Sequence, residues 1–178
     1  MSKSKVDIIP PRDIFMGDAR AAFSIVLFGD YESISCAEAN RMIRELVERY
    51  PGKIRYTFRH FPLTQIHQKA HKAAEAAILA AQYGKFWEMH ELLFAHRKQL
   101  GSISLRDYAI EAGVIDKNFL PKLTDSVYGW TVRNDLMEGL ERGVRTIPAI
   151  FVNEVLYEGD LSELTHAVEQ LVETGRRA

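Results

Sequence analysis

The stretch FGDYESISCAEA, residues 28–39, holds the side chains of this chain that are best suited to chemistry. It contains Cys36, the only cysteine among 178 residues, and Ser33 three positions earlier. It also runs from an apolar segment into an amphipathic one, as at the start of a helix, where free N–H groups and the helix dipole favour a thiolate. One thiol cannot close an internal disulfide. Cys36 is therefore half of a lost redox pair, a working single thiol or a small buried apolar residue.

The segments around this stretch predict a β-α-β unit. AAFSIVLF, Ala21 to Phe28, is apolar almost throughout, which is typical of a central strand covered on both faces. CAEANRMIRELVERY, residues 36–50, has one apolar helical face, and KIRYTFRHF, residues 53–61, alternates with the period of a strand. The two strands should be parallel and joined by a right-handed crossover.

The pattern then becomes helical from Leu63 to about Val144. Two long helices are predicted over residues 67–84 and 85–100, and shorter ones over 104–113 and 117–143, the last broken near Gly129. A hairpin turning at Asn153 and Glu154 and a helix from Leu161 to about Glu173 follow.

This order predicts an α/β protein: a thioredoxin fold with a helical domain inserted between a β-α-β half and a β-β-α half. The expected division is an N-terminal extension over residues 1–20, a core over 21–63 and 145–178, and an inserted helical subdomain over 64–144.

Composition limits the partners. A hydrophobic content of 47% suits one compact domain. The net charge is -1 with acidic and basic residues mixed, so the sequence has neither the excess of positive charge that binds nucleic acid nor a basic stripe that binds a membrane surface. Small molecules or proteins are the expected partners. The N-terminus has no continuous apolar run, so the default location is cytoplasmic, and periplasmic or secreted if a leader has been removed.

Three blocks resemble the DsbA-like family of thiol-disulfide oxidoreductases, in the same order and at suitable spacing. They are FGDYESISCAEA, the long segment from RYTFRHFPL to GKFWEMHELLF, and GVRTIPAIFVNE. The resemblance covers nearly the whole chain after Asp18. It implies a peptide or protein thiol as substrate and a cis Pro148 beside the active-site helix. It also implies that Ile147 offers its backbone N–H and C=O to an extended substrate segment.

The active-site motif departs from this family at three places. The family has two cysteines separated by two residues, whereas Ser33 takes the first position here, Ile34 and Ser35 follow, and only Cys36 remains. Serine cannot form a disulfide, so one chain cannot run the dithiol cycle. Leu27 stands where many members have a buried acid. Three coordinated departures favour natural divergence over a laboratory substitution of one cysteine.

Several functions remain open for Ser33 and Cys36. In the first, Cys36 is a core residue and Ser33 or Ser35 caps the helix. The protein would then be a redox-degenerate module that binds peptides beside Ile147 and Pro148. In the second, Ser33 resembles the serine of kappa-class glutathione transferases, and its hydroxyl would stabilise a glutathione thiolate. In the third, Cys36 is a monothiol similar to that of certain peroxiredoxins. No cofactor is expected for the module, and glutathione is the candidate cofactor for the enzyme.

The remaining histidines and aromatic residues are expected to be structural. His67 and His71 are four apart, at metal-ligand spacing, but further ligands are not apparent, so solvated or capping roles and no metal are expected. His60 should pack or hydrogen-bond. Phe86, Trp87, Phe94 and Trp130 are expected to form helical core.

Overall fold

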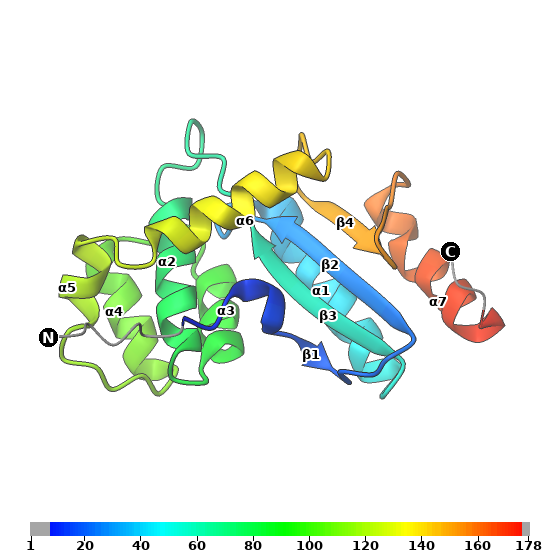
Figure 1. Cartoon of the computed structure of the whole chain (residues 1–178), viewed down its shortest axis with the longest axis horizontal. Coiled ribbons are helices and arrows are strands. Elements are labelled where there is room, and N and C mark those ends of the chain that lie inside the picture. The colour runs from blue at the N-terminus through cyan, green and yellow to red at the C-terminus, as the bar shows by residue number, and fades with distance from the viewer. Residues whose placement is uncertain (1–7, 176–178) are drawn as a thin grey trace, which may run out of the picture.

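The computed structural model describes residues 8–175, so the first seven residues of the expected N-terminal extension and the last three of the expected core lie outside it. A five-stranded sheet runs in the order β1-β3-β2-β4-β5, with helices on both faces (Figure 1). The strands are β1 (Met16–Gly17), β2 (Phe23–Gly29), β3 (Ile54–His60), β4 (Ala149–Val152) and β5 (Val155–Leu156). The predicted α/β class and thioredoxin fold are confirmed.

The β-α-β unit is present as predicted. Helix α1 (Ile34–Arg49) joins β2 to β3, and these two strands are parallel, with Leu27 beside Phe58. Strand β4 pairs antiparallel to the other side of β2 and β5 to β4. Strand β1 adds an antiparallel edge next to β3, within the stretch expected as an extension. Because β2 and β3 end at the same edge of the sheet, the segments that follow them meet there.

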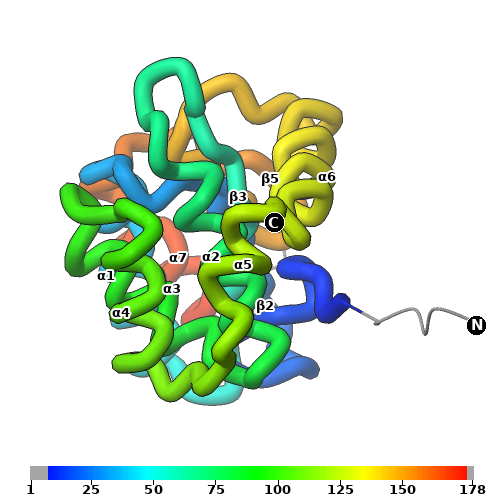
Figure 2. The backbone as a smooth tube through the Cα atoms, turned by 90° about the vertical axis from the view of Figure 1, so that its left-hand side faces the viewer, coloured from blue at the N-terminus to red at the C-terminus, as the bar shows by residue number. Residues whose placement is uncertain are grey.

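Five helices connect the two parts of the sheet: α2 (Ala70–Ala81), α3 (Phe86–Ala95), α4 (Ser102–Glu111), α5 (Phe119–Thr124) and α6 (Gly129–Glu141). Helix α6 crosses one face of the sheet and α1 covers the other, as the turned view makes clear (Figure 2). A short 3-10 turn (Pro11–Asp13) precedes β1, and another (Leu161–Glu163) leads into α7 (Leu164–Thr174).

Local backbone chemistry explains the boundaries. The turn between β4 and β5 has positive φ at both Asn153 (48°) and Glu154 (70°), which is the pattern of a two-residue hairpin whose twist matches its strands. The predicted break in the fourth helical segment falls between α5 and α6, where Ser126 has φ of 51° and Gly129 opens α6. Helix α2 begins at Ala70, not at His67, because residues 61–69 form the turn described below.

The sheet separates two apolar clusters. Alternate residues of β2 (Phe23, Ile25 and Leu27) belong to the large cluster that also contains α1 and α3 side chains, whereas Phe28 belongs to a small cluster beneath α6. Within residues 8–175, no helix combines the length and the apolar character needed to cross a membrane. Trp130 corrects one expectation: its side chain is 69% exposed at the start of α6 and does not form core.

Candidate functional site

Asp30 organises the turn between β2 and α1. Its Oδ1 accepts hydrogen bonds from the backbone N–H groups of Glu32 (3.2 Å) and Ser33 (3.0 Å). Its Oδ2 accepts from the backbone N–H of Leu63 (3.1 Å) and lies 2.7 Å from His67 Nδ1. The buried carboxylate therefore fixes both the start of α1 and the loop that follows β3. Asp30 was not among the residues predicted to matter, although a carboxylate directly between an apolar strand and a helix start is a visible signal in the sequence.

Ser33 is the N-cap of α1. Its backbone is extended (φ -75°, ψ 122°), and its Oγ accepts a hydrogen bond from the backbone N–H of Cys36 at 3.2 Å. This is the usual N-cap contact, which satisfies a free helix donor. In the part of the chain that the structure describes, no histidine, lysine or carboxylate side chain hydrogen-bonds the Ser33 hydroxyl. A serine without a general base is a poor nucleophile.

Cys36 is fully buried in the first turn of α1, with 0% of its surface exposed. Burial raises the pKa of the thiol from the ordinary 9.0 to about 11, although hydrogen bonds from Ser33 and the backbone of Asp30 act in the opposite direction. The sulfur packs against Gly29, where an added Cβ would lie 2.7 Å from Sγ. The thiol is therefore protonated and enclosed at neutral pH.

The strand beneath Cys36 gives the thiol no acidic neighbour. Leu27 is fully buried and points to the same face of β2 as Gly29, because the two positions are two residues apart on one strand. Both Leu27 and Cys36 belong to the large apolar cluster. The position at which the family resemblance implies a proton-accepting acid is thus part of an apolar core.

The loop before β4 lies against the start of α1. The Ile147–Pro148 peptide bond is cis. Ser35 from α1 and Pro148 together line an open cavity of about 280 Å³, whose other walls are Ile150, Tyr157, Gly159, Asp160 and Leu161. The structure therefore brings Pro148 next to the Ser33–Cys36 turn.

Ile147 directly precedes Pro148 in the chain but is not itself among the residues that line this cavity. Across residues 8–175, neither its N–H nor its C=O hydrogen-bonds another backbone group, and its side chain is partly buried against both apolar clusters. Backbone groups without a partner, next to a proline that lines an open cavity, are what an extended peptide needs for strand-like pairing.

His60 is buried under α6. Its backbone N–H and its Nδ1 both lie 3.0 Å from Asp135 Oδ2, and Arg59 Nε donates to Asp135 Oδ1 at 2.8 Å. Arg59 also forms two hydrogen bonds to Glu138. The expected packing and hydrogen-bonding role is confirmed. This network attaches α6 to β3 and does not reach the Ser33–Cys36 turn.

His90 forms a second buried network that sequence analysis did not anticipate. Its Nδ1 lies 2.9 Å from the Tyr31 hydroxyl and its Nε2 lies 2.9 Å from Asn40 Oδ1, which also accepts from the Tyr56 hydroxyl. An amide oxygen can only accept, so the proton is on Nε2 and Nδ1 accepts from Tyr31. Burial lowers the pKa of His90 well below its ordinary 6.5. The neutral ring thus links the turn between β2 and α1 to helices α1 and α3.

His67 and His71 do not act together. His67 lies in the turn before α2 and contacts Asp30, whereas His71, on α2, has its Nε2 3.4 Å from Glu75 Oε1. Among residues 8–175, no group of three or more His, Cys, Asp or Glu side chains is arranged to hold a metal ion.

Comparison with known proteins defines the class. A family model described as Thioredoxin matches residues 10–170, and the chain belongs to this family. Solved structures of a thiol-disulfide exchange protein and of a thiol-disulfide oxidoreductase share its fold.

The solved structures share the complete fold. BdbD from Bacillus subtilis, in its oxidised form, superposes with a TM-score of 0.79 over 92% of this chain and 93% of its own, at 20% identity. The thiol-disulfide exchange protein alpha-DsbA2 from Wolbachia pipientis has a TM-score of 0.72 over 93% and 88% of the two chains, at 24% identity. At these identities the likeness establishes the fold.

Sequence relatives are considerably longer proteins. A protein of Salinispora tropica named Na(+)/H(+) antiporter NhaA 3 is 36% identical over 154 residues, which is 86% of this chain but 24% of that protein. A second, NhaA 1 of Mycolicibacterium vanbaalenii, is 33% identical over 94% of this chain and 27% of its own length. The chain thus spans about a quarter of the length of these relatives. About three quarters of each relative lies outside the segment that matches this chain.

Proposed function

We propose that this protein is a DsbA-like module that binds an extended polypeptide segment beside α1 and has lost dithiol exchange. One contrast carries the proposal: the Cys36 thiol is fully buried, while an open cavity lies between Ser35 and Pro148, and the adjacent Ile147 makes no backbone hydrogen bond within residues 8–175. On this proposal the protein keeps the binding groove but has no reactive thiol beside it.

The chemistry of the turn supports this assignment. A thiol exchanges with disulfides as its thiolate, and the fraction of thiolate at pH 7 is very small when the pKa is about 11. Ser33 cannot supply the missing sulfur, and its hydroxyl is engaged as a helix cap. Strand-like pairing with a peptide needs only backbone groups, so it does not depend on either side chain.

The proposed partner is a peptide or an unfolded protein segment, with or without thiols. The neighbour from Wolbachia is described as a thiol-disulfide exchange protein, and this chain would retain the substrate-binding half of such an activity. We also place the module outside the cytoplasm, in preference to the cytoplasmic default expected from composition, in line with a neighbour from Salmonella that is described as periplasmic. Fractionation of cells that express the full-length natural protein tests the location.

A thiol-handling enzyme is the second candidate. The Ser33 hydroxyl lies beside the N-terminal turn of α1, where a glutathione thiolate could accept its hydrogen bond. This candidate requires glutathione to bind at the same cavity, and it predicts that Ser33→Ala abolishes conjugation activity. The module predicts unchanged peptide binding for that variant.

A steric block tests the groove. Ser35 is exposed and lines the cavity, so Ser35→Trp should fill it without disturbing the core. We expect the affinity for fluorescein-labelled, reduced and carboxymethylated α-lactalbumin, measured by anisotropy, to fall by at least ~10-fold, which corresponds to about 1.4 kcal/mol. Glu38→Trp, one turn along the exposed face of α1, is the control and should bind as the wild type does. Equal affinity of the wild type, Ser35→Trp and Glu38→Trp for the labelled protein would mean that the polypeptide does not bind in the cavity beside Ser35.

A further inference from the structure

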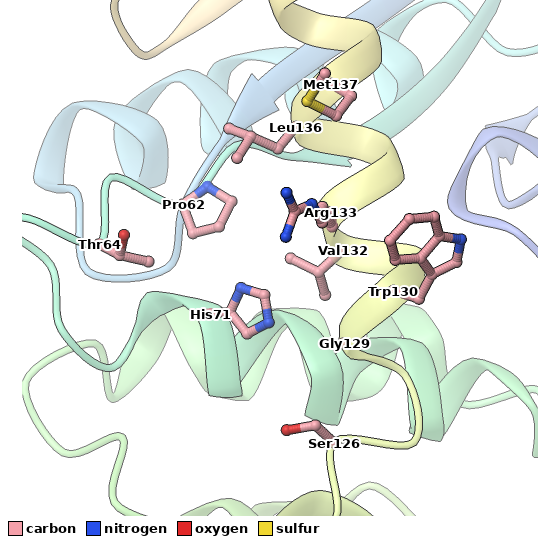
Figure 3. Close-up of a pocket in the computed structure, with 10 residues that line it drawn as sticks. All are labelled: Pro62, Thr64, His71, Ser126, Gly129, Trp130, Val132, Arg133, Leu136 and Met137. Carbon is pink, nitrogen blue, oxygen red and sulfur yellow. The ribbon is translucent and has the colours of Figure 1, made fainter.

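A second cavity lies on the α6 side of the molecule, apart from the groove beside Pro148. It has a volume of about 450 Å³ and lies between α6, the start of α2 and the loop after β3 (Figure 3). This volume is within the range of small-ligand sites. None of Ser33, Ser35, Cys36, Ile147 and Pro148 lines it.

The walls of this cavity are mostly apolar and include large side chains that are open to solvent. Pro62, Val132, Leu136 and Met137 line it, and the Trp130 ring forms one margin. Trp130 is 69% exposed and Met137 46% exposed. Large apolar groups gathered around a hollow are typical of a binding site, because covering them releases water.

Arg133 supplies the charge. In Figure 3 its guanidinium lies in the middle of the lining residues, between Pro62 and Val132. Its Cζ is 5.9 Å from the centre of the Trp130 ring. Among residues 8–175, no carboxylate lies within ion-pair distance of this guanidinium. It is therefore free to bind a carboxylate through two parallel hydrogen bonds.

The other charged side chains near the cavity lie within ion-pair distance of one another, although neither Glu75 carboxylate oxygen forms a hydrogen bond. Glu75 is fully buried on α2, with Lys72 Nζ at 3.1 Å and His71 Nε2 at 3.4 Å from its Oε1. Lys72 also donates to the Leu123 carbonyl and to Ser126 Oγ. With His71 counted as neutral, Lys72 balances Glu75, and Arg133 provides the remaining positive charge. The cavity thus suits an anion that carries an apolar group.

We propose that this cavity binds the C-terminal residue of a polypeptide, where that residue is large and apolar and its carboxylate pairs with Arg133. In an extended internal segment, side chains that point to the same face are two residues apart, or about 6.6 Å along the chain, so an acidic and an apolar side chain would enter the cavity at separate points. A terminal residue carries both groups on one Cα. The ligand class is therefore a peptide end with a free carboxylate.

The test uses four labelled ten-residue peptides of Gly and Ser, differing only at the end: Phe with a free carboxylate, Phe amide, Ser with a free carboxylate and Ser amide. We expect the Phe carboxylate to bind, and both amidation and replacement of Phe by Ser to weaken binding by at least ~10-fold in fluorescence anisotropy. Arg133→Gln should bind the Phe carboxylate and the Phe amide equally. Arg106→Gln, a change at an exposed arginine on α4, should keep the preference for the carboxylate.

Three results of these titrations would overturn the proposal. They are no binding of the Phe carboxylate at millimolar concentration, equal binding of the carboxylate and the amide by the wild type, and a carboxylate preference that survives Arg133→Gln. N-acetylphenylalanine should compete, because it carries the same terminal residue. Competition by 3-phenylpropanoate as strong as that by the peptide would overturn the proposal, since the ligand would then be any small apolar acid. Ser35→Trp should leave this binding unchanged, so a failure here is distinct from a failure of the groove.

Discussion

Gly29 and Cys36 are packed so closely that a methyl group on the glycine would lie 2.7 Å from Sγ and 3.2 Å from the cysteine Cβ. The sulfur in the first turn of α1 is thus in contact with the backbone of the central strand and is shielded from solvent. This contact gives Cys36 the role of a core residue, and several measurable properties follow from it.

Gly29→Ala should destabilise the fold. The added methyl group would overlap Sγ, and overpacking of this kind costs about 1–3 kcal/mol. Urea unfolding followed by circular dichroism measures the loss. In the Cys36→Ala background the cost should be smaller, because the sulfur that meets the methyl group is absent. Equal costs in the two backgrounds would mean that Cys36 is not the obstacle.

The Cys36 thiol should be almost inert in the folded protein. With a pKa of about 11, its reaction with 5,5′-dithiobis(2-nitrobenzoate) at pH 7.5 should follow unfolding, and so it should accelerate strongly in urea. Absorbance at 412 nm measures the rate. A folded protein that reacts as fast as free cysteine would contradict the buried position.

Stability should also fall at alkaline pH. The folded thiol keeps its proton up to about pH 11, whereas the unfolded thiol loses its proton near pH 9.0. The contribution of the protonated thiol to the free energy of unfolding is therefore fully present below pH 9.0 and is lost between pH 9.0 and about pH 11. The difference corresponds to roughly 3 kcal/mol. Urea unfolding at pH 8.5 and 10.5 measures the loss, and Cys36→Ala, which lacks the group, should show a smaller one.

Acid should weaken the fold through His90. Burial holds the ring neutral, whereas in the unfolded chain it takes up a proton below about pH 6.5. Because the pKa of His90 is lowered in the folded state, its contribution to the free energy of unfolding is fully present above pH 6.5. Below pH 6.5 the free energy of unfolding decreases by up to about 1.4 kcal/mol per pH unit. Urea midpoints at pH 7.5 and 5.5 measure this. His90→Gln should show a smaller change than the wild type. His166→Gln, at an exposed side chain on α7 that hydrogen-bonds Gln170, should not differ from the wild type.

Restoring the first cysteine should not by itself restore a fast oxidoreductase. Ser33→Cys places a second thiol one helical turn from Cys36, within the reach of a disulfide. Resolution by Cys36 should be slow, because its apolar site around Leu27 raises the thiol pKa. Stopped-flow measurement of mixed-disulfide resolution should show that adding Leu27→Glu speeds the reaction. If the single variant is as fast as the double, Leu27 is not the limiting feature.

Much of this architecture could be predicted from the sequence because it depends on local signals. The apolar run of β2 and the alternation of β3 defined the β-α-β unit, and the polar pair Asn153 and Glu154 marked the hairpin. The Asp30–His67 contact joins residues 37 apart through a turn with no regular pattern, so no periodicity could reveal it. Trp130 was assigned wrongly because an aromatic residue in a helical pattern does not disclose which face the helix buries.

The central claim is that the groove beside Ile147 binds polypeptide without the thiol. Anisotropy titration of labelled, carboxymethylated α-lactalbumin into the wild type and Cys36→Ala tests it most directly. We predict dissociation constants that agree within about twofold, because the buried sulfur lies outside the groove. Binding that disappears in Cys36→Ala, or that neither protein shows, would contradict this account.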